Sequence, residues 1–519
     1  MSGSQPSALI ARLGILFMLG LLAGCARGLP PVDHGPVLAL SSDTESFVMD
    51  QRRMQLDPDS PLSAFQLLDT GRDAFTVRAA LIEAASHRID AQYYIWNDDD
   101  SGRYLAGRLV TAADRGVQVR LLLDDINVAG KESLFAMLEA HPNIAIRIFN
   151  PSSSRNGAGR WLSFITDFDR INRRMHNKTF VVDDQVGIAG GRNIGDEYFD
   201  EDPQLNFRDR DVMVLGPLAA DMTRNFEAYW NNRWAYPLSQ LYKLPDSEQA
   251  VYHLSSLSRA TTGPLAFKTA LPRGRAGAEQ LLETWFAAMI QAEGELVFDP
   301  PPENPDAPAN TPRATANALF RLTEAARSEI LIESAYLILA EAQLEGLDNL
   351  NNQSLRVTAL TNSLATNDLV PNHSGYARWR RSMLEQGITL HELRPDAPAC
   401  KRWVTNRQAC DQGMVSLHSK AVVFDRETLF IGSFNVNLRS IYLNGETVLI
   451  IRSPELARTV AEDIDDALKP ENSWQVTVGA DGRMVWTSQN QEWHREPEVG
   501  FWRRAASRML SWLPIEKYL

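Results

Sequence analysis

The chain has 519 residues, of which 44% are hydrophobic, and its formal net charge is −13. A chain of this length is too long to fold around one hydrophobic core of ordinary size, which predicts two or three domains. The acidic balance gives no general attraction to polyanions, so free duplex DNA is disfavoured as a partner. Any phosphate chemistry must therefore depend on local basic groups.

The N-terminal segment predicts export and lipid attachment. Arg12 precedes an apolar run over residues 13–23, and the sequence Leu-Ala-Gly-Cys ends at Cys25. The run is shorter than a typical transmembrane helix, and small residues precede the thiol. The segment therefore resembles a bacterial lipoprotein signal peptide. We expect residues 1–24 to be removed and residues 25–59 to tether the protein, through lipid on Cys25, to a bacterial envelope membrane facing the periplasm. An uncleaved anchor helix is the alternative, and the inner and outer membranes both stay open.

Two further cysteines, Cys400 and Cys410, remain once Cys25 is lipidated. In an oxidising compartment an even pair favours a disulfide that closes a small loop. Two unpaired thiols in a loop are an equally good interpretation of the sequence.

The rest of the chain is duplicated. Buried apolar runs recur in the same order in both halves, with a helical pattern that ends in glycine between them, so each half contains a strand–helix–strand unit. The matched strands are 88–96 with 329–338, 117–125 with 355–363, and 144–151 with 388–395, and the matched helices are 102–116 and 375–387. We expect an α/β fold with a first lobe over residues 60–298, an exposed Pro-rich linker over 299–313 and a second lobe over 314–519.

The duplication includes a polar motif, His-x-Lys-x-x-x-x-Asp. An asparagine follows each motif histidine by 17 residues, and an acid lies eight residues before a later proline in both halves. The chain has only nine histidines, so two matches in register are not accidental. The residues are His176, Lys178, Asp183, Asn193 and Asp209 in the first half, and His418, Lys420, Asp425, Asn435 and Glu446 in the second.

Paired histidines, lysines and amides suit attack on a phosphodiester. The lysines and asparagines can donate to the non-bridging oxygens, while one imidazole attacks phosphorus and the other acts as acid and base. We expect no metal and no cofactor. Asp209 and Glu446 can hydrogen-bond the imidazoles. Asp183 and Asp425 are interpreted as structural supports.

Two other interpretations of the motif are disfavoured. If the motif occurred once, the simpler interpretation would be a histidine that caps an edge strand beside a solvated lysine. Two copies in register argue against that interpretation. Zinc binding is disfavoured because each half offers one histidine and no cluster of cysteines or carboxylates at ligand spacing.

The segments "HNKTFVVD…GGRN" and "HSKAVVFD…GSFN" resemble the two HKD motifs of the phospholipase D superfamily. The resemblance extends from residue 60 to the C-terminus. It implies two α/β/α lobes packed about a pseudo-twofold axis, one shared active site and catalysis through a phosphohistidine. The implied half-sites are His176, Lys178 and Asn193, and His418, Lys420, Ser433 and Asn435, with the lysines, the asparagines and Ser433 on the substrate phosphate. The family pattern favours His176 as nucleophile, although Gly191 stands opposite Ser433 and breaks the symmetry.

The export signal, both motifs, the sequence "NFRDRDVMVLGP" and the ending "LPIE" resemble bacterial cardiolipin synthases of the C type. That resemblance implies transfer of a phosphatidyl group between phospholipids at a membrane surface. Phosphatidylglycerol is the expected acceptor, and phosphatidylethanolamine is one choice of donor. A hydrolytic phospholipase D that releases phosphatidic acid, a periplasmic nuclease of the same fold and a non-catalytic envelope scaffold are the alternatives. A nuclease would bind polynucleotide in a salt-sensitive manner.

Two basic segments have two interpretations each. The first, before the HKD motif of the first half, either guides an anionic headgroup or lines a solvated face. Its members are Arg155, Arg160, Arg170, Arg173 and Arg174. The C-terminal tail combines Trp502 and Trp512 with three arginines, which suits an anionic membrane interface. The alternative is a terminal helix docked on the protein, with its aromatic side chains in the core and its arginines in water.

Overall fold

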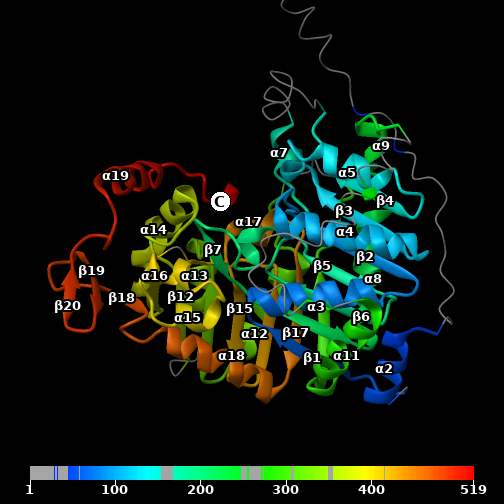
Figure 1. Cartoon of the computed structure of the whole chain (residues 1–519). Helices are drawn as coiled ribbons and strands as arrows, with labels where there is room; N and C mark the ends of the chain where they lie inside the picture. The colour runs from blue at the N-terminus through cyan, green and yellow to red at the C-terminus, as the bar shows by residue number, and fades with distance from the viewer. Residues whose placement is uncertain are drawn as a thin grey trace, which may run out of the picture.

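The computed structural model describes most of the chain and is drawn in Figure 1. The described residues are 29, 32, 45–57, 59–153, 167–246, 254, 255, 257, 271, 272, 274–304, 309–348, 355–413 and 415–519. The predicted signal peptide with Cys25, most of the predicted tether, and Arg155 and Arg160 lie outside these residues. No helix within the described ranges is long and apolar enough to cross a membrane.

The first half contains a mixed sheet in the order β9–β4–β3–β2–β5–β6–β8–β1. Its strands are β1 (Ser63–Leu68), β2 (Arg88–Tyr93), β3 (Gln118–Asp124), β4 (Ile144–Phe149), β5 (Thr179–Val182), β6 (Val186–Gly190), β8 (Asp211–Leu215) and β9 (Ala235–Pro237). Strands β2, β3 and β4 pair in parallel and the other neighbours are antiparallel. Every residue of β2 is buried, as expected for a parallel strand covered on both faces.

Helices cover this sheet on both faces. They are α2 (Phe47–Gln55), α3 (Gly71–Ala84), α4 (Asp100–Asp114), α5 (Glu132–Glu139), α7 (Phe168–Ile171), α8 (Pro217–Trp230), α9 (Leu238–Leu241) and α11 (Gly274–Ala287). The apolar side chains of α3, α4 and α5 pack with those of β2, β3 and β4 in one core. Pro217 begins α8 at a position where its missing N–H is not needed.

The second half repeats the same sheet in the order β20–β19–β18–β13–β12–β11–β15–β16–β17. Its strands are β11 (Glu329–Ser334), β12 (Arg356–Asn362), β13 (Thr389–Leu393), β15 (Lys420–Phe424), β16 (Thr428–Gly432), β17 (Thr447–Arg452), β18 (Ser473–Val478), β19 (Met484–Ser488) and β20 (Gln491–Trp493). Its helices are α12 (Ala314–Ala325), α13 (Glu341–Asp348), α14 (Val370–Glu385), α15 (Cys400–Trp403), α16 (Arg407–Asp411), α17 (Leu438–Tyr442), α18 (Pro454–Ala467) and α19 (Phe501–Leu510). The predicted duplication and α/β class are confirmed.

Strand β10 (Ile290–Phe298) joins the two sheets. Residues 290–292 pair with β1 of the first half, and residues 293–298 pair with β17 of the second. The last strand of the predicted first lobe therefore pairs mainly with the second half. The predicted linker also begins differently from our expectation, because Asp299 is buried rather than exposed. Its carboxylate accepts hydrogen bonds from the backbone N–H and the hydroxyl of Thr315.

The two halves pack on each other through a shared hydrophobic core. Val181 and Val212 of the first half and Val423 and Leu449 of the second belong to this cluster, together with the apolar face of α18. Figure 1 shows the blue-to-green first half and the yellow-to-red second half side by side. A further contact forms where β7 (Asn206–Arg208) pairs in parallel with β14 (Val415–Leu417).

A disulfide joins Cys400 of α15 to Cys410 of α16. Both cysteines are buried in a small cluster with Trp403 and Val415. The bridge therefore braces the loop that leads into β14 and the second motif.

Candidate active site

The two motif histidines lie where the halves meet. The backbone N–H of His176 donates to the carbonyl of Gly445 at 2.8 Å, and the backbone N–H of His418 donates to the carbonyl of Arg208 at 2.8 Å. Both imidazoles are buried. Each histidine is thus positioned by main chain from the opposite half.

Each imidazole pairs with a carboxylate of the other half. Nδ1 of His176 lies 2.8 Å from Oε2 of Glu446, and Nδ1 of His418 lies 2.5 Å from Oδ2 of Asp209. Because a carboxylate accepts, Nδ1 carries the proton in both rings and the lone pair lies on Nε2. The sequence predicted both acids, but the crosswise pairing depends on how the halves pack.

Glu446 is held by four side chains. Besides His176, its oxygens accept hydrogen bonds from Ser433 Oγ at 2.5 Å, Ser440 Oγ at 2.7 Å and Asn444 Nδ2 at 3.1 Å. We predicted that Ser433 binds the substrate phosphate. Its hydroxyl proton goes to Glu446 instead, so in this structure Ser433 positions the acid.

Asp209 has fewer side-chain partners and lies closer to the main chain. Its Oδ1 accepts from the backbone N–H of Arg210 at 2.8 Å. A Cβ atom at Gly191 would lie 2.1 Å from this oxygen, which is far inside van der Waals contact. The first half therefore needs glycine where the second half has Ser433. This close approach explains the asymmetry seen in the sequence.

Burial sets the charge of the imidazoles and their acids. It lowers the pKa of His176 to about 4 and that of His418 to about 3, so both rings are neutral near pH 7. Burial alone would raise the pKa of Glu446, but its interactions with the adjacent His176 and Lys178 lower it. The pKa of Asp209 is lowered in the same way, against burial, by His418 and a neighbouring lysine. Each pair is thus a neutral imidazole on an anionic carboxylate.

The two motif lysines are buried next to their histidines. Nζ of Lys178 donates to the carbonyl of His176 at 2.6 Å, and Nζ of Lys420 donates to the carbonyl of His418. Burial lowers the pKa of Lys178 to about 7 and that of Lys420 to about 8. Each ammonium group keeps further protons for an anionic ligand. Each lysine also lowers the pKa of the histidine in the opposite half, so the two half-sites act on each other.

The motif asparagines occupy equivalent positions, three residues beyond β6 and β16. Both are buried. Oδ1 of Asn193 accepts from the backbone N–H of Ile95 at 3.1 Å, and the side chain also hydrogen-bonds Tyr198. Oδ1 of Asn435 finds no hydrogen-bond partner among the described residues. The first amide is therefore held in place, whereas the second is less restrained.

A family model described as "Cardiolipin synthase, PLD-like domain" matches residues 79–230 and 319–468, one match in each half. The chain belongs to the phospholipase D superfamily. Cardiolipin synthase C of Escherichia coli (strain K12) is 36% identical over 460 residues, which cover 86% of this chain and 94% of that protein. The major cardiolipin synthase of Bacillus subtilis (strain 168) is 23% identical over 414 residues, 78% of this chain and 69% of that protein.

A solved structure shares the fold. Phosphatidylserine synthase from Haemophilus influenzae Rd KW20 superposes with a TM-score of 0.56 at 13% sequence identity, covering 91% of this chain and 100% of that one. The shared architecture agrees with a fold of two phospholipase D lobes. The chain is therefore a phospholipase D-superfamily enzyme that is similar to cardiolipin synthases.

Three tyrosines of this phospholipase D site were missed in the sequence. The Tyr94 ring lies 5.0 Å from the His176 ring, edge to face. The Tyr198 and Tyr336 rings lie 5.3 Å and 6.5 Å from His418 in similar geometry. Tyr94 and Tyr336 come just after the first parallel strand of their halves, and this shared position was the signal that could have found them.

The two HKD aspartates lie away from the imidazoles, in the turns after β5 and β15. Asp183 accepts hydrogen bonds from the backbone N–H groups of Ser86, His87 and Arg88, which lead into β2. Asp425 accepts in the same way from the three N–H groups that lead into β11. Both adopt a positive φ, which aspartate tolerates better than most residues. Their contacts are those of structural supports.

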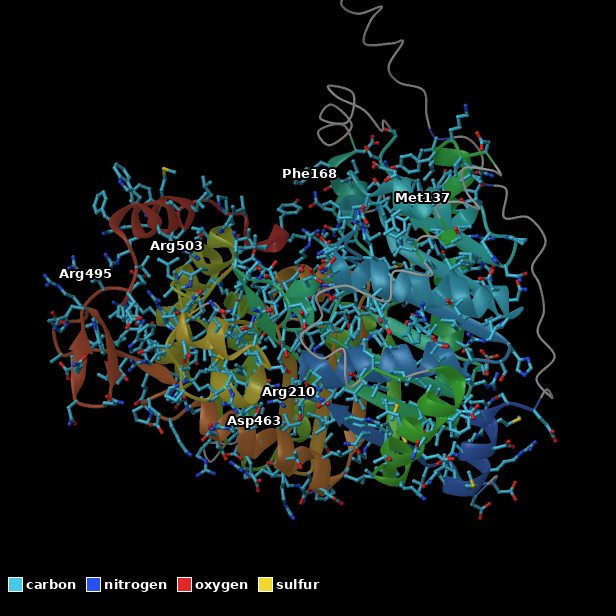
Figure 2. The ribbon with its side chains drawn as sticks, in the orientation of Figure 1. Met137, Phe168, Arg210, Asp463, Arg495 and Arg503 are labelled. Carbon is cyan, nitrogen blue, oxygen red and sulfur yellow. A yellow bond between two sulfur atoms is a disulfide. The ribbon has the colours of Figure 1, made fainter. Side chains whose placement is uncertain are left out.

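A charged cluster beside His418 ties the phospholipase D lobes together. Nε of the buried Arg210 donates to Oε2 of Glu333 at 2.8 Å, and its Nη2 pairs with Asp463. Figure 2 shows Arg210 and Asp463 close together at the base of the second half. Glu333 also accepts from the hydroxyl of Ser419 at 2.6 Å. The residue after Asp209 is therefore linked to the residue after His418.

The described arginines before the first motif do not form a free basic surface. Arg170 is buried and pairs with Asp167 at 2.9 Å, and Arg174 is buried and pairs with Asp124 at 3.0 Å. The interpretation that these two arginines guide a headgroup is therefore wrong. They brace the loop that carries His176.

Proposed function

We propose that this enzyme is a phosphatidyltransferase that makes cardiolipin from two phospholipids. The observation that carries the proposal is the crosswise pairing of His176 with Glu446 and His418 with Asp209. It is supported by 36% identity over most of the chain to the cardiolipin synthase C of Escherichia coli. Two imidazoles with free Nε2 atoms beside two buried lysines are what a double displacement at a phosphodiester requires.

In the first step, Nε2 of His176 attacks the phosphorus of the donor phospholipid. A P–N bond forms, and the P–O bond to the headgroup alcohol breaks with its electron pair on oxygen. Nε2 of His418 gives a proton to that oxygen. The anionic phosphodiester between the two rings raises the pKa of His418 above its value in the empty site, so that the ring can carry this proton.

In the second step, the headgroup hydroxyl of phosphatidylglycerol enters next to the phosphatidyl-histidine. Nε2 of His418 takes the hydroxyl proton, the oxygen attacks phosphorus, and the P–N bond breaks to return neutral His176. Glu446 and Asp209 keep the Nδ1 protons in place and stabilise positive charge on each ring. The product is cardiolipin, and water in place of the second lipid would give phosphatidic acid.

The buried cations supply the charge that the phosphorus centre needs. Lys178 and Lys420 donate to the non-bridging oxygens, where negative charge increases in the transition state. Asn193 and Asn435 add neutral donors from the two halves. We assign Ser433 to holding Glu446, because its proton is already used there.

The test is an analysis of lipid products. Purified full-length protein is incubated in mixed micelles with labelled phosphatidylglycerol, with and without phosphatidylethanolamine, beside a His176→Ala variant. We expect cardiolipin with the wild type and none with the variant. Phosphatidic acid without cardiolipin would make the enzyme a hydrolase. No lipid product, together with salt-sensitive retention of polynucleotide, would favour the nuclease alternative.

We also propose that the mature protein is anchored through lipid on Cys25 and faces the periplasm. The proposal depends on the N-terminal sequence alone. Metabolic labelling with a radioactive fatty acid should mark the wild type and not a Cys25→Ser variant. Label on both proteins, or on neither, would contradict it.

A further inference from the structure

Helix α19 exposes its apolar side to solvent, which is the reverse of an ordinary surface helix. Phe501 is 70% exposed, Trp502 is 82% exposed and Met509 is 64% exposed, while Ser507 is buried. Trp512, just after the helix, is 75% exposed. A surface helix normally buries its apolar stripe and turns its polar side to water. The alternative from the sequence, with the aromatic side chains in the core and the arginines in water, is therefore wrong.

Arginines hold the inner side of α19 against the protein. Arg503 donates from Nη2 to the backbone carbonyl of Asn367, just before α14. Nε of Arg504 donates to the carbonyl of Glu496 at 3.0 Å. Figure 2 shows Arg503 on the side of α19 that faces the body of the second half. The outward direction of the apolar stripe is thus fixed by specific contacts on the opposite side.

The chain after α19 ends against the segments that flank both HKD motifs. Nδ2 of Asn437 donates to the carbonyl of Leu519 at 3.0 Å, and Nη1 of Arg439 donates to the carbonyl of Tyr518 at 3.0 Å. The Tyr518 ring lies 4.9 Å from the ring of Phe168 in the first half. In Figure 2 the C-terminal end lies between α19 and Phe168. The chain that follows the exposed stripe therefore ends against the loops around the site.

We propose that Phe501, Trp502, Met509, Trp512 and Leu513, named here the tail face, dock into the surface of an anionic phospholipid bilayer. Aromatic and long apolar side chains on one side of a short amphipathic helix are typical of a helix that lies in the plane of the interface. Exposed large apolar side chains gathered in one place mark an interaction surface.

Charge favours a bilayer over a second copy as the occupant of the tail face. Arg508 is exposed on α19 next to Met509, where its guanidinium can reach lipid phosphates. Two copies of this chain, each with net charge −13, repel each other overall, which disfavours a second copy as the occupant. The docked helix would hold the loops around the site against the membrane that contains the substrate of the proposed function.

The first test measures where the two tryptophans lie. Full-length protein is mixed with phosphatidylglycerol vesicles whose acyl chains carry bromine, which quenches tryptophan fluorescence only over short distances. We expect quenching with the wild type and loss of most of it in a Trp502→Ala/Trp512→Ala double variant. Short range makes the result independent of any other segment that holds the protein on the vesicle. Equal quenching in both proteins would overturn the proposal.

Matched single variants refine this test. Met509→Ser should weaken the quenching, whereas Met54→Ser should leave it unchanged, because Met54 on α2 is 67% exposed but far along the chain from the tail face. Arg508→Ala should weaken it more in anionic than in neutral vesicles, with the exposed Arg483→Ala as control. A different result would assign the tail face to a second copy instead. Light scattering would then show concentration-dependent dimers of the wild type but not of the double tryptophan variant, and the brominated lipid would not quench the fluorescence.

The second test measures turnover and depends on the proposed function. The double tryptophan variant should lose roughly tenfold or more of its transfer rate on vesicles, because two aromatic side chains no longer enter the apolar part of the bilayer. Its rate on short-chain phosphatidylglycerol dispersed below the micelle concentration should match the wild type. Quenching without any turnover would leave the tail face standing and refute the proposed function, whereas equal losses on both substrates would refute the link between the tail face and turnover.

Discussion

The two half-sites contain the same pair of imidazole and carboxylate but support it by different means. Glu446 reaches His176 with one more methylene than aspartate has, and three side-chain donors fix it. Asp209 is shorter, so the main chain at Gly191 and Arg210 must approach it closely. The two halves share the pairing of imidazole with carboxylate, whereas the groups that position the carboxylate differ between them.

The residues next to the histidines differ in charge as well. Asn177, after His176, donates to the hydroxyl of Thr447 at 2.6 Å, so the contact between halves is neutral there. Ser419, after His418, belongs to the cluster of Glu333 and Arg210, which is ionic. Two halves with the same motif therefore present two environments. Different roles for the two histidines are consistent with this difference.

Removing each histidine should give the largest effect and separate their roles. We expect His176→Ala and His418→Ala each to lower kcat on phosphatidylglycerol by about 10⁴-fold or more. A phosphodiester with a p-nitrophenol leaving group needs no acid. On that substrate His418→Ala should recover a burst of p-nitrophenol and hold labelled phosphate on the protein, while His176→Ala should do neither.

The control is the same burst assay on the wild type. Label retained by His176→Ala and not by His418→Ala would reverse the assignment of nucleophile and acid. Equal recovery in both variants would mean that the half-sites are functionally interchangeable.

Substitutions at Gly191 and Ser433, which occupy equivalent positions in the two halves, should have the next largest effect. Gly191→Ser places a Cβ against Asp209 and should displace the acid from His418, lowering kcat by about 10²-fold or more. Ser433→Gly removes one of several donors to Glu446 and should cost about tenfold or less. Steady-state kinetics on both variants checks the order. A larger loss from Ser433→Gly would contradict the structural account, and circular dichroism verifies that each variant is folded.

The loss of the lysine charges at high pH should have a smaller effect on kcat/KM. The pKa of Lys178 is about 7 and that of Lys420 about 8, so rising pH removes the charge of Lys178 first and that of Lys420 second. We therefore expect kcat/KM to fall in two stages above about pH 7, because the transition state loses its cations. Thermal unfolding over the same range is the control. A flat profile up to about pH 9 would show that these amines stay charged or take no part.

The two HKD aspartates should give the smallest effect on turnover and a measurable effect on stability. Asp183→Asn replaces an acceptor of three backbone N–H groups and should lower the free energy of unfolding by about 1–3 kcal/mol. Asp425→Asn should cost less, because residues 327 and 328 beside it are more exposed to water. Chemical denaturation measures both, and kcat per folded molecule should stay near the wild-type value. A selective loss of kcat would assign these aspartates to catalysis.

Much of the site could be predicted because its residues repeat in register. The HKD histidines, lysines and asparagines recur at identical spacing, and the strands that carry them recur as matched apolar runs. The partners of each imidazole could not be assigned, because Glu446 and Asp209 reach across the contact between halves. The hydrogen bond from Ser433 to Glu446 lies within the second half, and the spacing of the motif residues did not indicate it.

The C-terminal helix shows a different limit of sequence reasoning. The spacing of Phe501, Trp502 and Met509 on one side of α19 is the same whether that side faces the core or the solvent. Only the contacts of Arg503 and Arg504 decide the direction. The buried Asp299 could not be foreseen either, because a Pro-rich stretch predicts exposure unless a partner such as Thr315 is known.

Strand β10 has a consequence for the order in which the protein can fold. Ribosomes produce β10 well before β17, yet residues 293–298 find their ladder partners only in β17. Until then the nascent first half carries an unpaired strand edge, which is a template for pairing with other chains. A fragment that stops after β10 should therefore aggregate, and the second half completes the fold of the first as well as its chemistry.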